Sequence, residues 1–334
     1  MKQPLHRSCL SALARAAGLA WLLFMSSFAL AQTSFPNKLV RIIIPYQAGG
    51  STDILARLLG VALSKQMGQP VVVENRAGAG GIIGTDYVAK SPPDGYTLLL
   101  TPPAPITANV ALYATLPYDP RKDLRMVSDI ATTRTVLAVH PSISAKTFRE
   151  LVALIKASPG KYSMGSWGAG TLPHQVQTYM DNQYGLQTLH VPYKGESPMA
   201  MDVISGVITM TVGSITTLQP YITTGKMRAI AVVGTRRADA LPEVPTFAEQ
   251  GFSQDVYALM APTSLLAPAG TPDAVVERLG QAVRTVMQQP EIRQRIEALG
   301  AEPVGNLPAE AAAGYKVLFP VMLDLVKATG VTLN

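Results

Sequence analysis

Cysteine is nearly absent from this sequence: the only one, Cys9, lies ahead of an apolar N-terminal run. Without that leader the chain has no thiol, which excludes disulfides, thiolate catalysis and cysteine-based metal sites. Charge is also sparse. Charged residues make up 15% of the chain and the formal net charge is +6, with no basic stripe of the kind that nucleic-acid binders carry. After Leu30 no apolar stretch is long enough to span a membrane.

The segment 1–31 has the order of a secretory signal peptide. Basic Lys2, Arg7 and Arg15 precede or open the apolar run, and the Ala-Leu-Ala sequence at 29–31 ends it. The run is too short and too near the terminus to favour a permanent span, although an uncleaved anchor is the alternative. We therefore expect cleavage after Ala31 and export of a soluble chain across the membrane.

The segment Ile44–Asp53, IPYQAGGSTD, joins a strand to a helix. Leu39–Ile44 is largely β-branched and apolar, and the residues after the turn recur at helical spacing, namely Ile54, Leu55, Leu58, Leu59, Ala62 and Leu63. The first N–H groups of such a helix lack internal partners and lie at the positive end of its dipole, which suits a carboxylate or phosphate. Gly49 and Gly50 let a ligand approach closely. A plain turn that caps the helix is the alternative.

Strands and helices alternate along the chain, which is typical of an α/β fold. Because parallel strands place their ligand crevice at their carboxyl ends, we expect 48–53, 76–81 and 101–105 to share one sheet edge. A strand over 135–140 should cross into a second domain, and 260–268 should return. The predicted domains are a discontinuous domain I of 32–137 plus 255–334 and a domain II of 138–254.

A second strand, glycine-rich turn and helix occur at Gly165–His174, GSWGAGTLPH. If the two domains face each other, one small ligand could touch both helix N-termini, as in a clamshell receptor that closes on its ligand. Tyr46 and Trp167 are candidate pocket walls or ordinary packing residues. Asp53 most simply complements its helix dipole, or else accepts a bond from a ligand ammonium group. His174 either organises its loop or touches ligand.

Patterns for catalysis and metal binding are missing. The histidines lack the His-Glu-x-x-His spacing of a zinc helix, and the serines, including Ser166 and Ser214, lack a Gly-x-Ser-x-Gly elbow. Gly78–Gly84 only approximates a dinucleotide fingerprint and follows the second strand instead of the first. We therefore expect a chain that is not an enzyme and needs no cofactor. A secreted hydrolase is an alternative, and its mark would be a nucleophile with a base in reach.

A set of ordered motifs covers the chain after the leader: PYQAGGSTD at 45–53, VENR at 73–76 with the glycine-rich 78–84, SPPDGYTLL at 91–99, HVPYKG at 190–195, LPEVPT at 241–246 and APAGTP at 267–272. Together they resemble the solute receptors of tripartite tricarboxylate transporters, the Bug family. The resemblance implies a periplasmic binding protein of the type II clamshell kind, with two α/β domains joined by crossing strands. Such a receptor would hand a small carboxylate to inner-membrane permease subunits.

Family members typically hold the ligand carboxylate with backbone N–H groups and water at two loops, which match 46–53 and 166–174 here. We add Thr101 and Ser214, which end two other strands. The expected ligand-binding residues are Tyr46, Gln47, Ala48, Gly49, Ser51, Thr52, Asp53, Thr101, Ser166, Trp167, Gly168, Gly170, Thr171, His174 and Ser214. The expected ligand is a small organic anion, a mono- or dicarboxylate, bound by a monomer.

The sequence departs from the family pattern at Gln47 and Trp167, which are bulkier than usual there, and at 211–214, which lacks an aromatic–acid pair. These departures favour a carboxylate with an aromatic or uncharged tail. An alternative function is a sensory receptor that presents its ligand to a membrane signalling partner, which would share the fold and the pocket.

Overall fold

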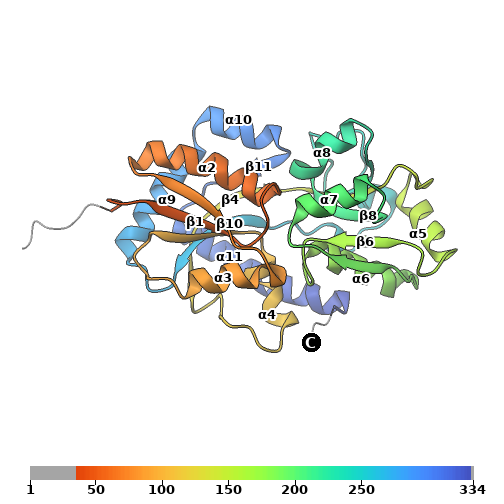
Figure 1. Cartoon of the computed structure of the whole chain (residues 1–334), viewed down its shortest axis with the longest axis horizontal. Helices are drawn as coiled ribbons and strands as arrows, with labels where there is room; N and C mark the ends of the chain where they lie inside the picture. The colour runs from red at the N-terminus through yellow and green to blue at the C-terminus, as the bar shows by residue number, and fades with distance from the viewer. Residues whose placement is uncertain (1–34, 332–334) are drawn as a thin grey trace, which may run out of the picture. The chain divides into compact units, whose positions relative to one another are not determined.

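The computed structural model describes residues 35–331, so the predicted leader and its cleavage site lie outside the described residues. All the elements below belong to Lys38–Asn334, which forms a unit separate from Met1–Asn37. Within it the strands form two sheets, one drawn on the left and one on the right of Figure 1. We call each sheet with its covering helices a lobe.

The first lobe contains a six-stranded sheet of order β11-β4-β10-β3-β1-β2. β1 pairs in parallel with β2 and β3, so the loops after these three strands share one edge, as the sequence indicates. β10 pairs antiparallel with both β3 and β4. The strands are β1 (Val40–Ile44), β2 (Val71–Asn75), β3 (Thr97–Thr101), β4 (Leu124–Thr133), β10 (Pro262–Pro268) and β11 (Ala301–Pro303).

The second lobe contains a five-stranded sheet of order β7-β6-β8-β5-β9. β6 pairs in parallel with β7 and β8, whereas β5 lies antiparallel between β8 and β9. The strands are β5 (Thr135–Val139), β6 (Ser163–Ser166), β7 (Leu189–Pro192), β8 (Met210–Ser214) and β9 (Arg228–Val233).

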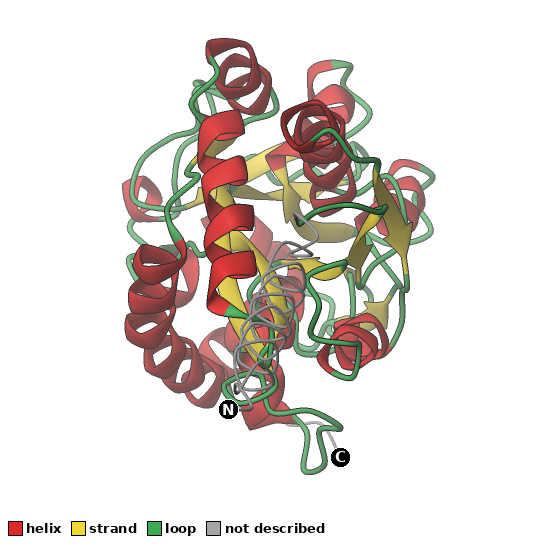
Figure 2. Cartoon of the chain, turned by 90° about the vertical axis from the view of Figure 1, so that its left-hand side faces the viewer, coloured by secondary structure: helices red, strands yellow, loops and turns green. Residues whose placement is uncertain are grey.

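Helices cover the sheets, and in Figure 2 they lie outside the strands. Their bounds are α2 (Ser51–Met67), α3 (Ile82–Ala89), α4 (Ala108–Leu112), α5 (Phe148–Lys156), α6 (Leu172–Tyr184), α7 (Glu196–Ile204), α8 (Ile215–Thr223), α9 (Asp273–Met287), α10 (Pro290–Ala298) and α11 (Pro308–Thr329). Short 3-10 turns lie at η1 (Ala79–Gly81), η2 (Ala104–Ile106), η3 (Ala248–Gln250) and η4 (Asp255–Tyr257). No helix in the described part of the chain combines the length and apolarity needed to cross a membrane.

Each lobe has its own apolar core. Ile43, Leu99 and Leu266 meet in the first lobe, on three neighbouring strands. The second core is built around Phe148, whose ring packs edge-on against four other aromatic rings. Separate cores let the lobes move as bodies, because little packing has to change inside either one.

The chain crosses from the first sheet to the second at Arg134, between β4 and β5, and returns ahead of β10. The two crossing strands of the first sheet, β4 and β10, are neighbours. Helix α11 also reaches across: its C-terminal residue Thr329 accepts a hydrogen bond from Asn182 of α6 at 3.1 Å. The predicted domain boundary after residue 137 falls inside β5, and the boundaries stay a prediction.

Candidate ligand-binding site

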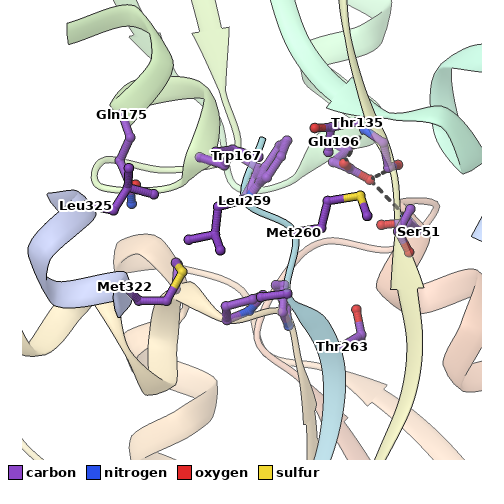
Figure 3. Close-up of a pocket in the computed structure, with 17 residues that line it drawn as sticks. Ser51, Thr135, Trp167, Gln175, Glu196, Leu259, Met260, Thr263, Met322 and Leu325 are labelled. Carbon is purple, nitrogen blue, oxygen red and sulfur yellow. Dashed lines mark hydrogen bonds between the residues drawn. The ribbon is translucent and has the colours of Figure 1, made fainter. Parts of the chain in front are cut away.

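A cavity of about 100 Å³ is lined by residues of both lobes (Figure 3). Ser51 at the start of α2 and the loop after β3 come from the first lobe, and Trp167, Gln175 and Glu196 come from the second. The returning segment 259–261 and helix α11 close the rest. The volume leaves room for a small molecule and exceeds that of a cavity for one water.

The cavity wall is mainly apolar, with Trp167, Leu259, Met260, Met322 and Leu325 among its residues. Its polar groups are hydroxyls, the Gln175 amide and the Glu196 carboxylate. Of the residues described, none lining this cavity is a lysine, arginine or histidine. An anion bound here would therefore depend on backbone N–H groups, hydroxyls and helix dipoles.

A second pocket of about 40 Å³ lies at the first turn of α2. It shares Ser51, Trp167 and Glu196 with the larger cavity, so the two spaces adjoin. Tyr46 forms part of its wall, and the phenol donates a hydrogen bond to the Gly80 carbonyl at 3.3 Å. Burial raises the pKa of Tyr46 well above its ordinary value of 10.0, which keeps the phenol neutral.

Glu196 connects the helix starts of both lobes. One carboxylate oxygen, Oε2, accepts the Ser51 N–H of α2 at 3.0 Å, and Oε1 accepts the Ser214 N–H at the start of α8 at 2.9 Å. The hydroxyls of Ser214 and Thr217 also donate to Oε2, each at 2.8 Å. Figure 3 shows the side chain reaching across to Ser51. An anion does lie at the N-terminus of α2, and it belongs to the protein.

Asp53 serves the fold of its own loop. Its Oδ2 accepts the Gly49 N–H at 3.0 Å, and both oxygens bond the guanidinium of Arg57 one turn later. Asn75 on β2 donates to Oδ1 at 3.0 Å and to the Tyr46 carbonyl at 3.1 Å. Burial opposes ionisation of Asp53, but these hydrogen bonds outweigh it and lower its pKa. The carboxylate thus fixes the turn between β1 and α2.

The loop after β6 is closed by its own hydroxyl groups. The Gly168 carbonyl accepts from the Ser166 hydroxyl at 3.0 Å and from the Thr171 hydroxyl at 2.6 Å. Gly170 N–H donates to Nδ1 of His174 at 2.9 Å, so this nitrogen must be unprotonated. Burial lowers the pKa of His174, which favours that state. His174 therefore organises its loop, one of the two roles the sequence allows.

Ser166 and His190 are a serine and histidine in hydrogen-bond contact, at 2.7 Å from Oγ to Nε2. The Ser166 hydroxyl also lies 3.0 Å from the Gly168 carbonyl, and which group donates between Ser166 and His190 depends on the imidazole tautomer. Ser166 is 0% exposed and is not among the residues lining either pocket. The pair links β6 to β7 away from both pockets.

The lobes also touch at two rims beside these pockets. Gln47 N–H donates to the Lys194 carbonyl at 3.0 Å on one side. On the other side Gly80 and Gly168 meet backbone to backbone, since a Cβ on Gly168 would lie 2.9 Å from Gly80 Cα. The cleft is closed around the cavity in this structure.

Comparison with known proteins identifies the chain. The sequence pattern of the family described as "Tripartite tricarboxylate transporter family receptor" matches residues 55–311. The chain belongs to this receptor family. Protein BugT of Bordetella pertussis (strain Tohama I) is 33% identical over 302 residues, which cover 90% of this chain and 92% of BugT.

Solved structures of similar proteins agree with the receptor fold. A periplasmic transporter structure has a TM-score of 0.85 at 39% identity and covers 90% of this chain and 100% of its own. An R. palustris protein solved with adipate has a TM-score of 0.85 at 30% identity and covers 90% and 99% of the two chains. The prediction of a periplasmic-binding-protein clamshell with two α/β domains is confirmed, and the chain is a solute receptor of the tripartite type.

The structure of the receptor brings part of the expected site to the pockets. The pocket walls include Tyr46, Gln47, Ser51, Thr52, Asp53, Trp167 and Ser214. The remaining expected residues are not among the lining residues: Ala48, Gly49, Thr101, Ser166, Gly168, Gly170, Thr171 and His174. Thr101 is fully buried and its hydroxyl donates to the Pro102 carbonyl. Direct ligand contact by the expected residues stays a prediction.

Two side chains that the sequence reading missed also face the receptor's cavity. Glu196 is one, and a glutamate at the start of a helix after a Tyr-Lys-Gly turn was its only sequence signal. Gln175 is the other: it lies on α6 and points into the cavity from above in Figure 3. Its Oε1 and the hydroxyl of Thr133 are buried without a hydrogen-bond partner among the described residues. Buried polar atoms of this kind are usually satisfied, so they are natural ligand contacts.

Proposed function

We propose that this receptor binds a small organic carboxylate in the periplasm and delivers it to inner-membrane permease subunits. The observation that supports this proposal most directly is a closed cavity between two lobes, with a helix N-terminus and a tryptophan in its wall. We infer that the ligand carboxylate lies beside Glu196, where Thr52 and Asp53 of the first turn of α2 line the second pocket, and that the rest of the ligand extends along Trp167 toward Leu325. An aromatic or otherwise uncharged body suits that apolar wall.

The test is a ligand screen by thermal unfolding with a panel of citrate, aspartate, adipate and aromatic monocarboxylates. A ligand at one hundred times its Kd stabilises the native state by about 2.7 kcal/mol. Trp167 is the only tryptophan outside the leader, because the other is Trp21. Its fluorescence should therefore change with any ligand that raises the melting temperature. A strong response to citrate or aspartate with none to aromatic acids would refute the aromatic-body assignment.

The proposal includes export and processing. We propose that residues 1–31 are removed as a signal peptide and that the mature chain works as a monomer without a cofactor. Intact-mass measurement of the periplasmic fraction and light scattering test these points. A mature N-terminus other than Gln32, or a stable dimer, would contradict them.

A sensory receptor is the second candidate, since its pocket would be the same. Growth of a deletion strain on the ligand as sole carbon source separates the two functions, with a signalling reporter measured in parallel. Loss of growth with an intact reporter supports transport. We also propose that the chain is not an enzyme. Neither the parent protein nor Ser166→Ala should hydrolyse the ester and amide substrates with which they are incubated.

A further inference from the structure

The carboxylate of Glu196 occupies the kind of place where a bound anion is expected. Its two oxygens accept two backbone N–H groups and two hydroxyls, from the first turns of α2 and α8. The residue is 8% exposed and lines both pockets. A buried carboxylate with this many charge-assisted hydrogen bonds is costly to displace. Glu196 is thus a fixed part of the wall.

We infer that the Glu196 carboxylate occupies an anion-binding position that a second ligand carboxylate would otherwise take. We call this position, at the first turns of α2 and α8, the seat. The receptor therefore selects a ligand with one carboxylate and an uncharged body over a dicarboxylate. This inference rests on the proposed function, because it specifies the ligand class of the same cavity.

The charge balance of the cavity disfavours a ligand with two negative charges. A helix N-terminus carries roughly half a positive charge, so α2 and α8 together offset about one carboxylate, which Glu196 already supplies. No lysine, arginine or histidine lines the larger cavity in the part of the chain that the structure describes. A dicarboxylate would add two negative charges beside the Glu196 carboxylate, whereas a monocarboxylate would add one.

An unpaired hydrogen-bond acceptor, on the Gln175 side chain, lies at the other end of the cavity. The Gln175 side chain is fixed in orientation, because its Nε2 donates to the Gly170 carbonyl at 2.8 Å. In the described part of the chain, its Oε1 is then the unpaired atom of an amide that lines the cavity. Gln175 is 1% exposed, so water from outside does not easily satisfy it. A ligand hydroxyl or amide N–H would bond this oxygen, whereas an ionised carboxylate has only acceptors and would be repelled.

Matched ligand pairs test the inference on the whole mature protein. The probes are adipate with its monoamide and terephthalate with its monoamide, titrated by calorimetry and by Trp167 fluorescence. In each pair the monoamide keeps one carboxylate and replaces the other with a neutral donor of similar shape. We expect the monoamide of at least one pair to bind about tenfold more tightly or better. Equal affinities, or tighter binding of both dicarboxylates, would overturn the inference and leave the carboxylate-receptor function standing. Failure of all four probes to bind would count against both.

A variant of Glu196 provides the second arm. Glu196→Ser opens the seat and removes its charge, so the preference for the monoamide should fall by about tenfold. Glu150→Ser is the matched control, because Glu150 is also a first-turn glutamate, in the capping box of α5, and it lines neither pocket. An unchanged preference in a folded Glu196→Ser protein would overturn the inference. Should that variant not fold, the comparison of the pairs on the parent protein still decides.

Discussion

The backbone contact between Gly80 and Gly168 predicts that closure of the cleft can be blocked without touching the cavity wall. A Cβ on Gly168 would lie 2.9 Å from Gly80 Cα in the opposite lobe, closer than real Cβ atoms approach. Gly168 also has a φ of +137°, so alanine adds backbone strain of about 1–3 kcal/mol. The backbone strain raises the free energy of every state in which the loop keeps this conformation. The collision of the Cβ with Gly80 raises the free energy of the closed state alone.

Overpacking of this kind costs about 1–3 kcal/mol, which corresponds to roughly 5–150-fold in affinity if the ligand binds the closed state. Gly168→Ala should therefore weaken binding of the tightest ligand by that factor in titration calorimetry. Gly80→Ala should do the same from the first lobe, because its Cβ would lie 3.0 Å from the Ala169 carbonyl. Gly185→Ala is the control: its φ is +63° and no atom lies within 4 Å of its Cβ. It should lose stability and keep its affinity.

Two results would refute this reasoning. One is wild-type affinity in both Gly168→Ala and Gly80→Ala, which would mean that the ligand does not require the rims to meet. The other is an equal loss of affinity in Gly185→Ala, which would assign the effect to general destabilisation. Small-angle scattering of ligand-bound samples checks the cause, since the two rim variants should remain more extended than the parent protein.

Further predictions concern the fold around the site. Asp53→Ala should lower the free energy of unfolding by about 1–3 kcal/mol, because it removes the hydrogen bonds that the charged carboxylate accepts from Gly49 and Asn75. Denaturant titration measures this loss, and the surface-pair variant Glu297→Ala, with a change near zero, is the control. Phe148→Ala should cost about 3–5 kcal/mol by the same method, since a fully buried ring is lost from the second core. Burial, with a contribution from His174, lowers the pKa of His190 from 6.5 to about 4. The stability that the folded protein gains from a neutral His190 is fully present above pH 6.5 and is lost as the pH falls toward 4. The melting temperature of His190→Gln should lack this part of the pH dependence.

The local parts of this site are predictable from sequence because their causes are local. The run of β-branched residues up to Ile44 and the helical spacing after Ser51 specify a strand, a turn and a helix, and the structure has β1 and α2 there. The position of Asp53, three residues into the helix, likewise explains why it bonds the Gly49 N–H. Each interaction spans only a few residues.

The role of Glu196 could not be predicted in this way. Its bond to Ser51 spans 145 residues and depends on how the two lobes meet. The helix start of α2 attracts an anion for reasons that the sequence does show, but nothing local distinguishes a ligand carboxylate from the protein's own. The contact of Gly80 with Gly168 is non-local for the same reason, although both lie in glycine-rich segments that the sequence singles out.

The C-terminal turn of α11 has a consequence for how tightly this receptor holds its cargo. The helix packs on β4 in the first lobe, and its end contacts α6 in the second, where Asn182 binds Thr329 and Leu325 joins the apolar core. The helix therefore links the two lobes, because opening the cleft must either bend it or detach its end. The observed Kd equals the intrinsic Kd divided by the fraction of closed molecules. Changes at the Asn182–Thr329 contact, which lies outside both pockets, would therefore alter the affinity without changing a residue that lines the cavity.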